Sequence, residues 1–99
     1  MNVSAFQRSL SNPKPPARLP PALAALWWAA RDHWEQAHTI VMNDDGKDCA
    51  WVHAHLHRRE GDLDNARYWY RQAGRRPASG PFEAEWTAIA TALLQAKAS

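Results

Sequence analysis

Residues 60–66, which read Glu-Gly-Asp-Leu-Asp-Asn-Ala, decide how this chain folds. Glycine readily adopts the left-handed backbone that ends a helix, and aspartate accepts hydrogen bonds from the free amides at the start of the next one. We therefore expect one helix over 49–60 to end at Gly61 and a second helix, over 63–73, to begin after Asp62. Two helices joined by so short a connection must be antiparallel neighbours.

Upstream of this corner, the sequence predicts two more helices. Pro21 suits a first helical position, and the Ala- and Leu-rich residues 22–30 favour a helix that ends near residue 31. Asp32 is followed three residues later by Glu35, a pair typical of a capping box, so the next helix is expected over 33–42.

Downstream of the corner, Pro81 is expected to open a C-terminal capping helix. The apolar residues after it recur at helical spacing and form one stripe, namely Phe82, Trp86, Ile89, Leu93 and Ala96. The whole pattern predicts an all-α protein of about five helices in antiparallel hairpins.

The first 20 residues differ in composition from the rest. Five prolines fall between residues 13 and 21, and proline fixes φ and removes an amide donor. Residues 1–20 are therefore expected to form an extended, Pro-rich arm, and residues 21–99 a single helical-repeat domain. The arm carries Arg8, Lys14 and Arg18 without any acidic residue, so the basic character of the chain owes much to it.

The composition limits the class of protein. A chain of 99 residues holds one compact core, and its content of 45% hydrophobic and 22% charged residues is typical of a soluble protein. Six tryptophans make aromatic burial important. The longest apolar run has nine residues, Cys49 is the single cysteine, and no signal-peptide pattern is seen, so we expect a cytoplasmic protein without a membrane partner.

A repeat of helical hairpins is also indicated. Shifting the chain by 29 residues lays 32–37 over 61–66, so that a polar turn, a large apolar residue and an alanine recur in step. The segment from Ala50 to Pro77 resembles a tetratricopeptide repeat (TPR). The resemblance is carried by Gly61, Asp62, Ala66, Tyr70, Ala73 and Pro77.

This resemblance implies a scaffold that binds other proteins or holds itself in an assembly. In such repeats one side of the first helix lines a concave groove, which here implies a partner site made by Trp51, His55, Arg58 and Arg59. Tryptophan would offer an apolar platform, the arginines would bind a carboxylate, and histidine would add a titratable donor. We therefore expect a protein–protein interaction module or a small homo-oligomeric scaffold, with a protein or peptide partner.

Two alternatives come from other residues. Cys49, His53 and His57 share one face of the predicted helix, and two histidines one turn apart are chemically sensible zinc ligands. A straight helix separates Cys49 from His57 by about 12 Å, so a zinc site would use His53 and His57 without the thiol. The reading we favour makes both of them core histidines with no cofactor.

The second alternative is a nucleic-acid accessory protein, because Arg67, Arg71 and Arg75 recur every four residues along one helix. An acidic body and a nearby Asp64 favour a solvated face instead. No glycine-rich phosphate loop, nucleophile motif or pair of carboxylates in an apolar setting is present, so an enzyme is not expected.

Overall fold

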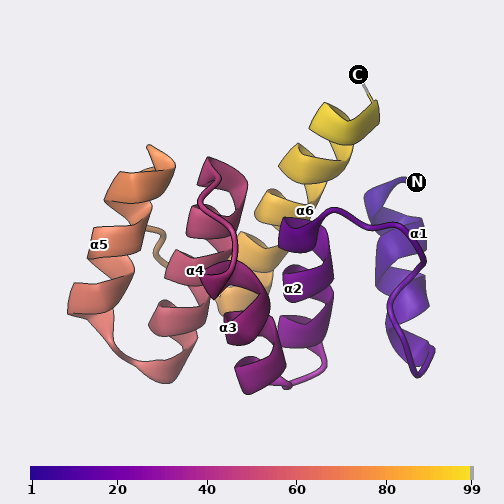
Figure 1. Cartoon of the computed structure of the whole chain (residues 1–99), viewed down its shortest axis with the longest axis horizontal. Helices are drawn as coiled ribbons and strands as arrows, with labels where there is room; N and C mark the ends of the chain where they lie inside the picture. The colour runs from indigo at the N-terminus through magenta and orange to yellow at the C-terminus, as the bar shows by residue number, and fades with distance from the viewer. Residues whose placement is uncertain (99) are drawn as a thin grey trace.

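The computed structural model describes residues 1–98 and shows an all-helical chain. That part of the chain contains six α-helices, one more than expected, and a short 3-10 helix. The α-helices are α1 (Val3–Arg8), α2 (Pro21–Ala30), α3 (Trp34–Met42), α4 (Lys47–Glu60), α5 (Leu63–Ala73) and α6 (Phe82–Ala98), and the 3-10 helix is η1 (Ser9–Ser11). In Figure 1, α5, α4, α2 and α1 follow one another from left to right across the molecule, so α1 and α5 lie at opposite ends.

The corner between α4 and α5 forms as predicted. Gly61 has a φ of 88°, in the left-handed region that favours glycine, and the amide of Asp62 donates to the carbonyl of His57 at 2.9 Å. The side chain of Asp62 accepts a hydrogen bond from the amide of Asn65 at 3.3 Å. The two helices therefore lie side by side and run in opposite directions (Figure 1).

Small residues on α5 allow this close packing. Ala66 and Ala73 are buried where α5 packs on α4. Tyr70 lies between these two alanines in the sequence of α5, and only 2% of its surface is exposed. The remaining core lies between α2, α4 and α6, where Trp27, Leu56 and Ile89 are all buried. The indole of Trp86 on α6 donates to the carbonyl of Leu26 on α2 at 2.7 Å, which ties these two helices together.

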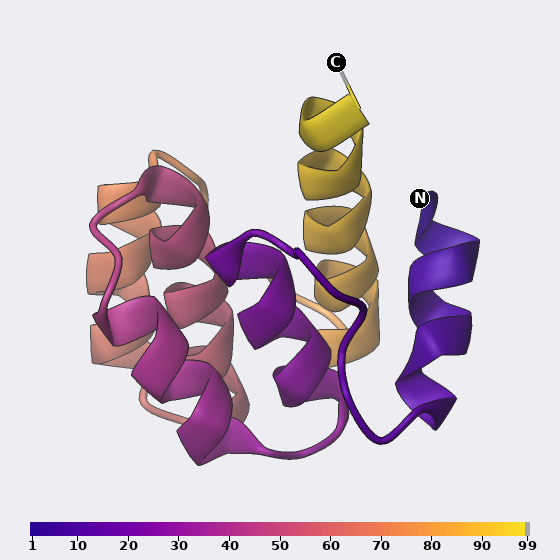
Figure 2. The same ribbon diagram turned by 45° about the vertical axis from the view of Figure 1, so that its right-hand side comes forward.

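The N-terminal arm differs from the prediction, because its first part is helical and packs on the body (Figure 2). Phe6 is fully buried and stacks on Trp86 with ring centroids 5.5 Å apart. The hydroxyl of Ser9 accepts a hydrogen bond from the indole of Trp27 at 3.1 Å. The prolines come after this segment, and residues 12–20, which contain four of the five, form no helix. Asn2 caps α1 by accepting from the amide of Ala5 at 2.8 Å.

The connection between α2 and α3 also corrects an expectation. Asp32 does not cap α3; its φ is 62°, and the residue before the helix is His33, whose side chain makes no capping hydrogen bond. Asp32 instead pairs with Arg59 at the end of α4, with 3.1 Å between the charged atoms. The aspartate therefore joins the turn to α4 rather than starting α3.

Candidate functional site

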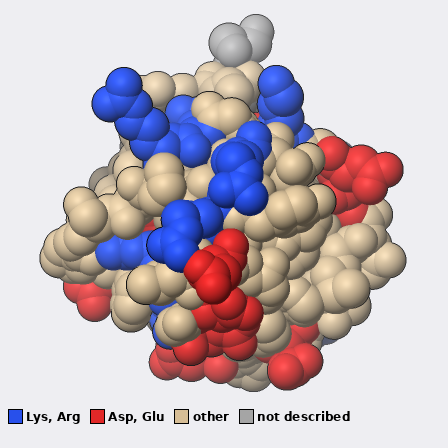
Figure 3. All heavy atoms as spheres, turned by 90° about the vertical axis from the view of Figure 1, so that its left-hand side faces the viewer, with Lys and Arg blue, Asp and Glu red and all other residues tan. Residues whose placement is uncertain are grey.

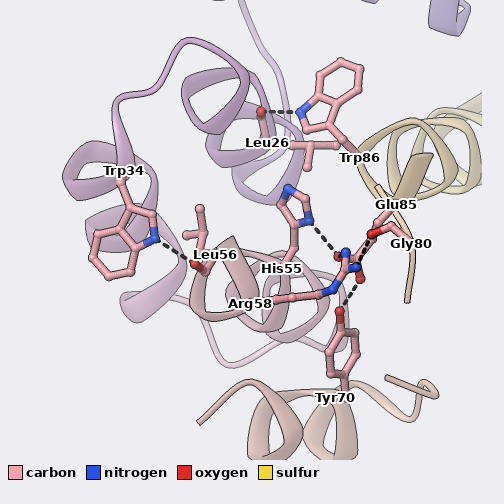
Figure 4. A network of polar contacts seen from close by, with 9 residues as sticks. All are labelled: Leu26, Trp34, His55, Leu56, Arg58, Tyr70, Gly80, Glu85 and Trp86. Carbon is pink, nitrogen blue, oxygen red and sulfur yellow. Dashed lines mark hydrogen bonds and ion pairs between the residues drawn. The ribbon is translucent and has the colours of Figure 1, made fainter. Parts of the chain in front are cut away.

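The expected partner groove is filled at two of its four residues, His55 and Arg58, which contact α6 and the segment just before it. His55 has no exposed surface, and its Nδ1 donates to Oε1 of Glu85 on α6 at 2.8 Å. The guanidinium of Arg58 contacts the same carboxylate oxygen at 3.1 Å and the carbonyl of Gly80 (Figure 4). The prediction that His55 and Arg58 line an open groove is corrected by this packing.

The carboxylate of Glu85 joins three helices. The hydroxyl of Tyr70 on α5 donates to its second oxygen, so α4, α5 and α6 meet at one buried acid (Figure 4). Burial alone would raise the pKa of Glu85, but hydrogen bonds from His55, Tyr70 and Arg58 outweigh burial and hold it below its ordinary value. Burial and the contact with Glu85 raise the pKa of Tyr70. This network holds the helices together.

The other two predicted groove residues lie apart from that network. Trp51 is 9% exposed, and the guanidinium of Arg75 covers its ring at 3.8 Å from the centroid. Arg59 is engaged with Asp32, as described above. Neither side chain offers the free platform or the free cation that the TPR resemblance implies.

Three histidines form a separate cluster between α3 and α4. His53 and His57 come from consecutive turns of α4, and His38 comes from α3. One ligand nitrogen from each residue lies within 4.8 Å of the others. Nε2 of His53 is 3.1 Å from Nε2 of His38. The sequence predicted His53 and His57 as a pair, and the fold supplies His38 as the third member.

Two tryptophans enclose this cluster. Trp34 stacks on His38 with a centroid separation of 4.5 Å, and its indole donates to the carbonyl of Leu56 at 2.8 Å (Figure 4). On the other side, Trp69 of α5 stacks on His53 at 4.0 Å. These ring contacts orient His38 and His53, and His53 is only 4% exposed.

The surroundings favour neutral imidazoles. Burial, together with the neighbouring His57 and His38, lowers the pKa of His53 from 6.5 to about 4. Burial and His57 also lower the pKa of His38. Nδ1 of His53 is buried without a hydrogen-bond partner among the described residues. At neutral pH these two rings therefore present uncharged nitrogens.

Glu60 orients the third ring. Nδ1 of His57 donates to Oε2 of Glu60 at 2.6 Å, which leaves Nε2 of His57 as the nitrogen with a free lone pair. A carboxylate on the far nitrogen is the arrangement that commonly fixes a metal-binding histidine. His57 also belongs to a second group of possible metal ligands, together with the exposed carboxylates of Glu60 and Asp62 at the corner.

Cys49 takes no part in the cluster, as the helix geometry predicted. It is 3% exposed, and burial together with Asp44 raises the pKa of its thiol to about 12. A buried thiol with so high a pKa remains protonated at neutral pH and is therefore a poor nucleophile.

Comparison with protein-family models, with curated proteins and with solved structures finds no match to this chain. Within residues 1–98, none of the helices has both the length and the apolar character needed to cross a membrane.

Proposed function

We propose that this protein is a small, non-catalytic helical domain that binds one divalent transition-metal ion through His38, His53 and His57. The observation that carries this proposal is the meeting of three imidazoles from two helices, with one ligand nitrogen of each within 4.8 Å of the others. Two nitrogens bound to a tetrahedral zinc ion lie about 3.3 Å apart. The 3.1 Å between His38 and His53 is close to that separation.

The donor set favours particular metals. Three imidazole nitrogens suit Zn²⁺, Cu²⁺ or Ni²⁺, whereas Mg²⁺ and Ca²⁺ prefer oxygen ligands. Three protein ligands leave a fourth position for water or another small ligand. Burial of His53 and His57 behind tryptophan rings leaves little room for a larger substrate, which supports a non-catalytic role.

The metal would also act on the fold. His38 is on α3 while His53 and His57 are on α4, so a shared ion would join these helices in addition to their packing. A ligand that binds only the folded state stabilises it. We propose that the TPR-like hairpin of α4 and α5 supplies His53 and His57, and that α3, packed on α4, supplies His38.

Titration calorimetry tests the proposal. Chelator-treated protein should bind Zn²⁺ in a ratio of one to one at neutral pH. Removing a carboxylate that only orients a metal-binding histidine typically lowers metal affinity by about 10–100-fold. His38→Gln and His53→Gln remove the ligands themselves, so each should lower zinc affinity by at least about 10-fold.

His33→Gln is the matched control, because His33 is exposed and lies outside the cluster. It should bind zinc as the unaltered chain does. Absence of zinc binding by the unaltered chain, or unchanged affinity in His38→Gln, would contradict the proposal.

A further inference from the structure

The outer face of α5 is not covered by any other described helix. This helix packs against α4 and lies at one end of the molecule (Figure 1). Asp64, Arg67 and Arg71 are exposed on this face, and Tyr68 is exposed to 46% between them. At about 100° per residue, these four positions share one side of the helix. The sequence motif of repeated arginines therefore lies on an open surface that the histidine site does not use.

The charges on this face are separated along the helix. Asp64 lies in the first turn and Arg71 in the last, and Arg75 and Arg76 follow the helix end. Figure 3 shows this side of the molecule, with basic side chains gathered above a group of acidic ones. Arg67 pairs with Asp64 within the helix, whereas Arg71 makes no ion pair within residues 1–98. The face thus has a negative end and a positive end.

Such a face is complementary to itself. If two copies of α5 lie antiparallel about a two-fold axis between positions 67 and 68, Asp64 of one copy faces Arg71 of the other, and the same pair forms twice. Arg67 of each copy then faces the ring of Tyr68 of the other, an arrangement in which cation and aromatic ring attract each other. An entirely acidic partner would satisfy Arg71 but would be repelled by Asp64.

We propose that the outer face of α5 is a self-association surface, on which a second copy of this chain docks in the antiparallel direction. The helix has 11 residues, so the contact is about 16 Å long and lies at the small end of the size range for protein interfaces. The association is therefore weak and reversible. It weakens further with added salt, because exposed charge pairs are screened.

Charge reversal tests the register directly. In Asp64→Arg both facing positions are basic, and in Arg71→Asp both are acidic, so each variant alone should be a monomer in sedimentation equilibrium at low salt. Mixed together, the two variants regain both opposite-charge pairs and should form a dimer of one copy of each. The unaltered chain should show a concentration-dependent rise in average mass toward the dimer.

A control separates this register from general charge attraction. Asp45→Arg and Lys14→Asp reverse exposed charges outside α5, so each of these variants alone should associate as strongly as the unaltered chain. The proposal is overturned if the unaltered chain remains a monomer at the highest soluble concentration, if the α5 variants fail to pair when mixed, or if either control variant alone is also a monomer.

The self-association test does not depend on the proposed metal site. Asp64 and Arg71 are not members of the histidine cluster, so both variants should bind zinc with the affinity of the unaltered chain. Binding of heparin or of an acidic peptide by the unaltered chain, without any rise in its own mass, would assign the arginines to a different partner and would also overturn the proposal.

Discussion

Replacing Glu85 by alanine should strongly destabilise the fold. The side chains of Glu85 and Arg58 are 4% and 10% exposed, so solvent screens their interaction poorly. Removing one partner of a buried ion pair costs about 3–5 kcal/mol, because the other charge stays buried without compensation. We expect Glu85→Ala to lower the free energy of unfolding by about 4 kcal/mol, a large part of the roughly 5–15 kcal/mol that stabilises a typical domain.

Urea unfolding followed by circular dichroism measures this change. Glu83→Ala is the matched control, since Glu83 is exposed on the same helix and its removal should change stability by no more than about 0.5 kcal/mol. A loss of less than about 1 kcal/mol in Glu85→Ala would refute the reasoning that a buried carboxylate joins three helices.

The contribution of Glu85 to the free energy of unfolding should also depend on pH. The pKa of Glu85 is lower in the folded state than its ordinary value of 4.5. Its contribution to stability is therefore complete above pH 4.5 and is lost as the pH falls through the lower folded-state pKa. The difference in stability between the unaltered chain and Glu85→Ala should narrow under acidic conditions.

Three further predictions concern single residues. Phe6→Ala should lower the free energy of unfolding by about 3–5 kcal/mol in urea titrations, because the ring is fully buried against Trp86; an unchanged value would mean that α1 does not pack on the body. Glu60→Gln should weaken zinc binding by about 10–100-fold in calorimetry, and equal affinity would exclude an orienting role. Metal-free protein should lose stability as the pH falls from 6.5 toward 4, because His53 takes up a proton in the unfolded state that it excludes in the folded state. The lowered pKa of His53 corresponds to roughly 3 kcal/mol of stability. Urea titrations across that pH range should show a smaller loss in His53→Gln.

Local sequence signals predicted the helices wherever backbone chemistry sets their ends. Gly61 and Gly74 end α4 and α5 in left-handed conformations, and α5 spans the predicted residues. The helix α1 was missed because the prolines that follow it dominated the composition of the arm. Its burial depends on Phe6 meeting Trp86, which is 80 positions away in the chain and is therefore invisible to a local pattern.

The site was predictable only in part, for a related reason. The spacing of His53 and His57 on one helix placed them together, but His38 joins them only through the packing of α3 on α4. His55 and Arg58 were interpreted as groove residues because of the TPR resemblance, which does not indicate that Glu85 covers them. Helical spacing puts Glu85 beside the apolar stripe of α6, three residues after Phe82 and four before Ile89. Its partners lie on α4 and α5, however, and only the packing of these helices brings them to the carboxylate.

The tryptophans around the histidine cluster give the protein a built-in optical probe. Trp34 and Trp69 lie in ring contact with His38 and His53, whereas Trp27 is buried in the core between α1 and α2. Copper or nickel held by the imidazoles would quench the emission of the first two indoles by short-range energy or electron transfer, while zinc, with its filled d shell, would not. Fluorescence would then report the binding of copper or nickel, and would distinguish either of them from zinc, without any added dye.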